Sequence, residues 1–108
     1  MKRIYENLGV RDGTIRFLGI WDTLLDKGVG ITPHLHEDVE EVYYILEGSG
    51  EVRIGDEVTS VSNGDIIYIP PRKIHTLIQH GDKMLRFITV SIDTSQKARS
   101  PPSPPYVA

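Results

Sequence analysis

The chain has 108 residues and no cysteine, and its 12 Lys and Arg against 15 Asp and Glu give a net charge of -3. A chain of this length forms one domain with a single core. The negative charge argues against nucleic acid as a main partner, because nothing attracts a phosphate backbone at long range. The lack of cysteine excludes disulfides and thiolate metal sites, and nothing indicates an oxidising compartment.

The N-terminal residues lack the apolar stretch of a secretory signal peptide. No apolar run approaches the roughly 20 residues that a membrane-spanning helix needs. We therefore expect a cytoplasmic protein without membrane contact.

The periodic segments have the composition of β-strands, beginning with residues 14–21, which are rich in β-branched and aromatic side chains. Two loops that begin with glycine are typical of two-residue hairpin turns: Gly55 within residues 52–59 and Gly81 within residues 77–90. No window shows a helical period. The pattern predicts an all-β sandwich or barrel.

Three histidines and one glutamate have spacings that suit a metal site. His34 and His36 lie two residues apart, which on a strand points both imidazoles to one face, and Glu41 and His75 follow. Three neutral imidazoles and a carboxylate suit one divalent transition metal, such as iron, manganese, nickel, copper or zinc. The alternative is that these are ordinary barrel histidines.

Residues 42–46 and 66–69 are apolar at consecutive positions, so neither face of either strand is predicted to meet water. One face can line a barrel, and the other needs a second layer. We expect a second subunit to supply it, which predicts a homodimer.

The character of the chain changes near its C-terminus, where residues 93–108 are polar and rich in proline. We expect residues 1–92 to form the barrel, including its N-terminal strands, and residues 93–108 to form a tail. Tyr106 and Val107 are the expected anchors of that tail on the dimer.

The segment from Gly28 to Gly48 resembles the first motif of the cupin superfamily: glycine, five residues, His-x-His, a short gap, glutamate, six residues, glycine. The fixed positions between the two glycines are His34, His36 and Glu41. All of these positions are met.

The second cupin motif is matched in part, on Gly64, Pro70 and His75. Arg72 stands where the family usually has glycine, and Gln79 stands where it has asparagine. The resemblance is to small single-domain cupins (monocupins). It implies a double-stranded β-helix, the cupin jelly-roll barrel, in which His34, His36, Glu41 and His75 bind one divalent metal.

Glu40 competes with Glu41 for the role of metal ligand. The six-residue spacing to Gly48 favours Glu41, and strand alternation then sends Tyr43 inward with it. Glu40 would lie on the outer face of the same strand.

Three residues are candidates for contact with a substrate. Tyr43 and Gln79 would line the pocket if alternation holds, with core packing and a satisfied core amide as the alternatives. Arg72, beside Lys73, would collect an anionic substrate, with a solvated turn as the alternative. His80, next to a turn, is expected on the surface.

The site leaves the reaction open. One hypothesis is a metal-dependent enzyme that acts on a small polar or carboxylate metabolite, by dioxygenase-like or by sugar-acid isomerase or lyase chemistry. The second is a non-catalytic module that binds or senses a small ligand. The third is a structural metal that only stabilises the barrel.

Overall fold

The computed structural model describes residues 2–5 and 16–95, and all regular elements in these residues are β-strands. The strands are β1 (Lys2–Tyr5), β2 (Phe17–Leu25), β3 (Val39–Glu47), β4 (Ser49–Ile54), β5 (Glu57–Ser62), β6 (Ile66–Ile69), β7 (His75–His80) and β8 (Leu85–Asp93). The all-β prediction is confirmed.

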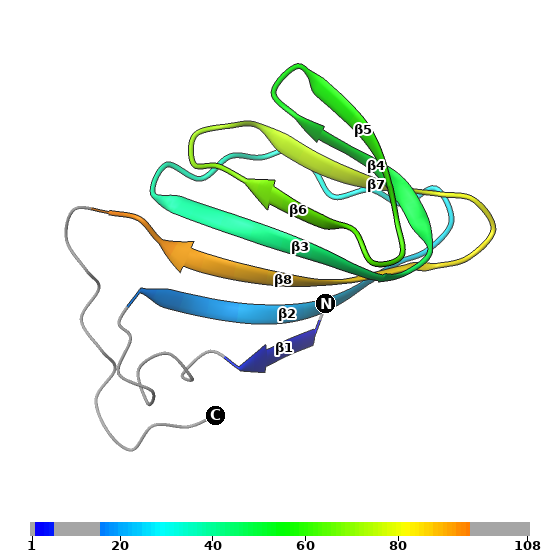
Figure 1. The fold of residues 1–108 in the computed structure, drawn as a ribbon, viewed down its shortest axis with the longest axis horizontal. Helices are drawn as coiled ribbons and strands as arrows, with labels where there is room; N and C mark the ends of the chain where they lie inside the picture. The colour runs from blue at the N-terminus through cyan, green and yellow to red at the C-terminus, as the bar shows by residue number, and fades with distance from the viewer. Residues whose placement is uncertain (1, 6–15, 96–108) are drawn as a thin grey trace.

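Two antiparallel sheets make up the described fold (Figure 1). The larger has the order β1-β2-β8-β3-β6, and the smaller has the order β5-β4-β7. Consecutive strands therefore alternate between the sheets several times, as in a jelly roll.

The core lies between the sheets, where strands alternate between inward and outward side chains. On β8, every second residue from Leu85 to Asp93 is buried. Phe87 and Ile45 are among the most completely buried side chains, at 1% and 0% exposure. Truncating a buried phenylalanine such as Phe87 to alanine typically costs about 3–5 kcal/mol of the free energy of unfolding.

The predicted hairpin at Gly55 is present, and β4 pairs with β5 across it. Gly55 has a φ of 58°, the left-handed value that glycine adopts without steric cost. The predicted hairpin at Gly81 is wrong. β7 pairs with β4 in the small sheet, whereas β8 lies between β2 and β3 in the large one, so both of its edges are occupied.

The predicted element boundaries agree in part with the observed ones. The strand expected at residues 14–21 is observed as β2, which runs on to Leu25, and residues 14 and 15 lie outside the described residues. β8 ends at Asp93, next to the predicted tail boundary. Tyr106 and Val107 lie outside the described residues.

Within residues 2–5 and 16–95, no helix is long and apolar enough to cross a membrane.

The outer face of the large sheet carries exposed apolar side chains on neighbouring strands. Tyr44 on β3 pairs with Ile66 on β6, and Val42 pairs with Tyr68. Ile66 is 70% exposed and Tyr68 is 53% exposed. Contiguous apolar surface of this kind is typical of interaction sites.

We propose that this outer face pairs with a second copy of the chain, so that Ile66→Lys shifts a homodimer to a monomer. A lysine at an exposed position leaves the core untouched but would bury a charge in the interface. Sedimentation equilibrium at micromolar concentration measures the mass. Val58→Lys, at an exposed apolar position on β5 in the other sheet, is the control and should leave the dimer intact. A wild-type protein with the mass of one chain would contradict the proposal.

Candidate metal centre

Backbone pairing brings two of the histidines together across the fold. The segment between β2 and β3 adds isolated antiparallel bridges to β7, at Gly30 with Ile78 and at His34 with His75. The amide of His34 donates to the His75 carbonyl at 3.2 Å, and the amide of His75 donates to the His34 carbonyl at 2.9 Å. Residues that exchange both bonds face each other directly. The two imidazole centroids therefore lie 4.3 Å apart.

His36 joins the cluster from the loop that follows His34. The expected regular strand through both residues is absent, since His34 makes only a single bridge. Their rings nevertheless lie near each other, with centroids 5.0 Å apart.

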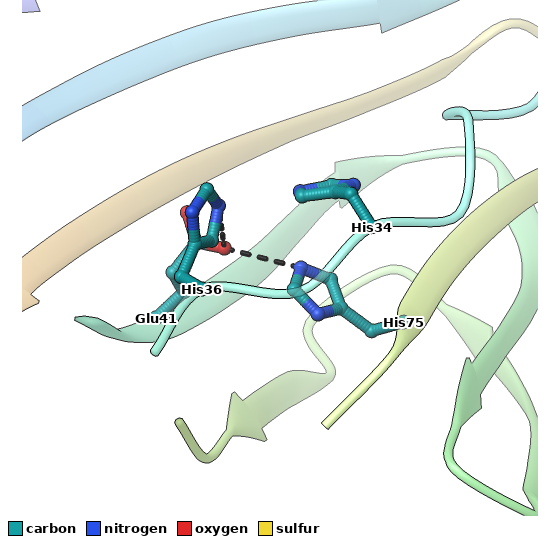
Figure 2. A group of neighbouring side chains, drawn as sticks. All are labelled: His34, His36, Glu41 and His75. Carbon is teal, nitrogen blue, oxygen red and sulfur yellow. Dashed lines mark ion pairs between the residues drawn. The ribbon is translucent and has the colours of Figure 1, made fainter. Parts of the chain in front are cut away.

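Glu41 enters the cluster from β3, and its neighbour on β8 orients it. Glu41 pairs with Ser91, and the Ser91 hydroxyl donates to Glu41 Oε2 at 2.8 Å. The other oxygen, Oε1, lies 3.2 Å from His75 Nε2 and 3.7 Å from His36 Nε2 (Figure 2).

Glu40 faces the other way, as alternation along a strand requires. The Tyr68 hydroxyl donates to Glu40 Oε2 at 2.8 Å on the outer side of the sheet. The structure thus places Glu41, and not Glu40, with the histidines.

Two backbone carbonyls orient the imidazoles. His34 Nδ1 lies 2.8 Å from the Thr32 carbonyl oxygen, and His75 Nδ1 lies 3.0 Å from that of Lys73. A carbonyl only accepts, so in each ring Nδ1 carries the proton and donates it. Each Nε2 is then available to bind a metal, an arrangement that recurs around metal-binding histidines.

The four side chains fit a divalent transition metal. One potential ligand atom from each lies within 4.8 Å of all the others. Glu41 Oε1 and His75 Nε2 are buried and find no hydrogen-bond partner when His75 is neutral, because two lone pairs then face each other. Only a cation or a shared proton satisfies both atoms. Three imidazole nitrogens and a carboxylate are a set that zinc, iron, copper and nickel accept.

In the metal-free protein, a proton shared between His75 and Glu41 can fill this role. Burial by itself lowers the pKa of His75, but hydrogen bonds to Glu41 and to the Lys73 carbonyl raise it overall. Burial raises the pKa of Glu41, yet hydrogen bonds from His75 and Ser91 and the charge of His36 lower it overall.

These shifts stabilise the metal-free fold most between the reference pKa values of 4.5 for Glu41 and 6.5 for His75. The contribution of Glu41 is lost as the pH falls through its lowered pKa. The contribution of His75 is lost as the pH rises through its raised pKa.

The cluster opens onto a cavity of about 530 Å³ between the inner face of the large sheet and the connection from β2 to β3. His34, His36 and Glu41 line this cavity, and His75 is buried beside them at 2% exposure. The remaining lining is mostly apolar or aromatic and comes from Leu18, Trp21, Thr23, Ile31, Val39, Tyr43, Phe87, Thr89 and Ser91. A mostly apolar cavity with a few grouped polar atoms is typical of small-molecule sites.

Tyr43 lines the cavity as the sequence predicts, and it also packs in the core. Its ring centroid lies 5.1 Å from that of Phe87 and 6.4 Å from that of His75. Burial raises the pKa of Tyr43, and the negative charge of Glu41 raises it further. The hydroxyl therefore stays protonated and is available as a hydrogen-bond donor.

Gln79 does not line the cavity, so its predicted position is corrected. The Gln79 amide nitrogen donates to the carbonyls of His80, Gly81 and Lys83, and Oε1 accepts from the amide of Gly28. These bonds satisfy the side chain and hold the connection from β7 to β8. His80 is exposed, as predicted.

Arg72 also lies outside the cavity lining. Its guanidinium donates to the Glu37 carbonyl at 3.1 Å and lies 4.0 Å from Asp38. Its backbone has a φ of 62°, and its amide donates to the His36 carbonyl at 2.7 Å. Arg72 thus connects the loop that carries His36 to the loop that precedes His75. The left-handed backbone explains why cupins usually have glycine at this position.

Sequence reasoning missed Ser91, Thr23 and the aromatic walls formed by Trp21 and Phe87. Alternation along β8 places Phe87 and Ser91 on one face, but only the pairing with β3 shows that this face meets Glu41. That pairing joins residues 50 positions apart in the chain.

We predict that replacing His34 and His36 together by alanine abolishes stoichiometric metal binding, because two of four ligands are lost. Metal analysis after reconstitution with zinc or iron measures the metal content per chain. His80→Ala removes an exposed histidine outside the cluster and should leave the metal content unchanged. A double variant that retains one metal per chain would show that the ligands are other residues.

Metal affinity is expected to rise with pH. The raised pKa of His75 means that a cation must displace its proton even somewhat above pH 6.5. Displacement of this one proton should contribute up to about tenfold in affinity per pH unit below that pKa. Zinc titrations against a competing chelator, from about pH 5.5 to 8, measure the effect. An affinity that is constant over this range would contradict a proton shared between His75 and Glu41.

Comparison with known proteins identifies the family. Residues 21–91 match the cupin domain family. Three curated relatives share shorter segments. An uncharacterized protein of Methanocaldococcus jannaschii is 41% identical over 54% of this chain. A gentisate 1,2-dioxygenase of Haloferax is 39% identical over 53%, and a 5-nitrosalicylic acid 1,2-dioxygenase of Bradyrhizobium is 37% identical over 56%.

The matched segments span 46%, 16% and 28% of these relatives, so the chain covers less than half of each. Among solved structures, a predicted oxalate decarboxylase from Thermotoga maritima has a similar fold, with a TM-score of 0.76 and 22% identity over 84% of this chain and 76% of that one. The family match covers more than half of the chain. The chain therefore belongs to the cupin family, and its two antiparallel sheets form the double-stranded β-helix of that family.

Proposed function

We propose that this cupin is a metal-dependent, dioxygenase-like enzyme that acts on a small aromatic carboxylate. The observation that carries the proposal is the position of the His34, His36, Glu41 and His75 cluster at a cavity whose other walls are mostly apolar.

The cavity walls favour an aromatic ring over a sugar. Trp21, Tyr43 and Phe87 line the cavity with aromatic surface, against which a planar ring packs well. A sugar acid would bring several hydroxyls into a site with few hydrogen-bond partners, and each unpaired hydroxyl would lose free energy on leaving water. The cavity thus supports the dioxygenase-like branch more than the sugar-acid isomerase or lyase branch.

The metal ligands lie where a carboxylate can be neutralised. A bound divalent ion would supply positive charge for an anionic group and, if it is redox-active, the means to activate dioxygen. Glu41 is held by Ser91, and His34 and His75 are held by backbone carbonyls, so the ligand set is oriented before a substrate enters. Tyr43, kept protonated, can donate a hydrogen bond to a substrate oxygen.

The relatives support the same branch. Two of them are dioxygenases, one for gentisate and one for 5-nitrosalicylic acid, and both compounds are hydroxylated benzoic acids. Because the chain covers only a small part of each enzyme, we propose dioxygenase-like activity for the site from its own geometry as well as from these relatives.

A non-catalytic binding or sensory module is the second candidate. Its support is that, of the described residues that line the cavity, Tyr43 is the only one besides the metal ligands that titrates, and its raised pKa makes it a poor base at neutral pH. For either function, the cysteine-free composition supports the proposed cytoplasmic location.

The test is oxygen consumption by the metal-loaded protein. Samples reconstituted separately with iron(II), manganese, nickel, copper or zinc are mixed with gentisate, salicylate or a sugar acid in an oxygen electrode. The proposal expects oxygen uptake with an aromatic acid and a redox-active metal only, and none in the His34→Ala, His36→Ala double variant. Aromatic acids that bind without oxygen uptake under any metal would favour the binding module.

A further inference from the structure

One cavity-lining side chain has a polar atom that the fold leaves unsatisfied. Thr23 on β2 is 7% exposed and lines the cavity. Its hydroxyl oxygen is buried, and among the described residues no group hydrogen-bonds to it. Buried hydroxyls are normally hydrogen-bonded, and an unpaired one destabilises the fold. The unpaired Thr23 hydroxyl therefore calls for a functional explanation.

Strand register places Thr23 and Glu41 at different levels of the cavity. Thr23 pairs with Phe87 on β8, and Glu41 on β3 pairs with Ser91 on the same β8. Phe87 and Ser91 are four residues apart, which separates the two levels by about 13 Å along the strand. Next to Thr23, Leu25 pairs with Leu85, which is fully buried and closes this end of the interior.

A ligand that reaches both levels needs a polar group at each end of a body that fills the mostly apolar space between them. A benzene ring with a carboxylate and a hydroxyl para to each other has its two polar groups at opposite ends. Its faces would lie against the aromatic surface that Trp21, Tyr43 and Phe87 provide.

We propose that Thr23 is a specificity-determining residue that hydrogen-bonds an uncharged polar substituent, such as a hydroxyl, on the side of the ring opposite the carboxylate. The inference rests on the proposed function, since it assumes an aromatic acid whose carboxylate lies at the metal ligands. The cross-strand neighbours of this level, Phe87 and Ile45, are apolar. A second carboxylate in place of the hydroxyl would therefore bring an unpaired charge into apolar surroundings and is excluded.

The experiment compares benzoate, 4-hydroxybenzoate and terephthalate as ligands of the zinc-loaded protein by titration calorimetry. The wild type should bind 4-hydroxybenzoate about three- to tenfold more tightly than benzoate, as one added hydrogen bond provides, and should bind terephthalate more weakly than either. Thr23→Val keeps the shape of the side chain but removes the hydroxyl, and should make the affinities for benzoate and 4-hydroxybenzoate equal. Thr23→Ser keeps the hydroxyl and should restore the preference.

Thr89→Val is the matched control. Thr89 is also 7% exposed and lines the cavity, but it pairs with Trp21 and Tyr43, one level nearer to the metal ligands. This variant should keep the preference for 4-hydroxybenzoate. The preference surviving in Thr23→Val, or being lost equally in Thr89→Val, would overturn the assignment.

Thermal unfolding of the ligand-free variants separates a binding role from a structural one. Removing an unsatisfied buried hydroxyl should leave the unfolding midpoint of Thr23→Val unchanged or raised. A lowered midpoint would reveal a structural partner and would overturn the inference. If benzoate binds the wild type but no preference for the hydroxyl appears, the inference fails and the proposed function stands. If none of the acids binds while zinc does, both fail.

Discussion

The backbone pairing of His34 with His75 is the contact on which the candidate site depends. It fastens the long connection between β2 and β3 to the small sheet and brings two imidazoles from distant parts of the chain to a centroid distance of 4.3 Å. The same connection carries His36, and Arg72 holds it from the other side through the His36 carbonyl. Backbone hydrogen bonds thus fix the positions of the three histidines, and these positions bring the imidazoles together.

The fourth residue of the cluster, Glu41, depends on a different constraint, the register of β3 in the large sheet. Glu41 pairs with Ser91 on one side and with Ile69 on the other. Because side chains alternate along a strand, a slip of one residue would turn Glu40 inward and send Tyr43 to the surface. The apolar inward positions of β3 and β8 oppose such a slip, so hydrophobic burial maintains the geometry of a polar site.

Polar and apolar side chains occupy different levels of the interior along the strand direction. Charged and imidazole groups gather at the level of Glu41 and Ser91, and the walls beyond them are mainly apolar. Apolar surroundings strengthen electrostatic interactions within the site and penalise unpaired polar groups. Such an interior suits the aromatic acid of the proposed function better than a polyhydroxylated ligand.

By itself, the sequence determined the strand content and the glycine turn at Gly55, because these follow from local spacing and alternation. The four residues of the cluster were indicated by the resemblance to the cupin motifs, and long-range pairing such as that of His34 with His75 brings them together. The tertiary structure decided which sheet each strand joins. It separated β7 from β8 where a hairpin was expected, turned Gln79 into a link between backbone carbonyls, and brought Ser91 to Glu41. These outcomes depend on contacts between residues tens of positions apart, whose pairing follows from the packing of the whole barrel and leaves no local periodic pattern.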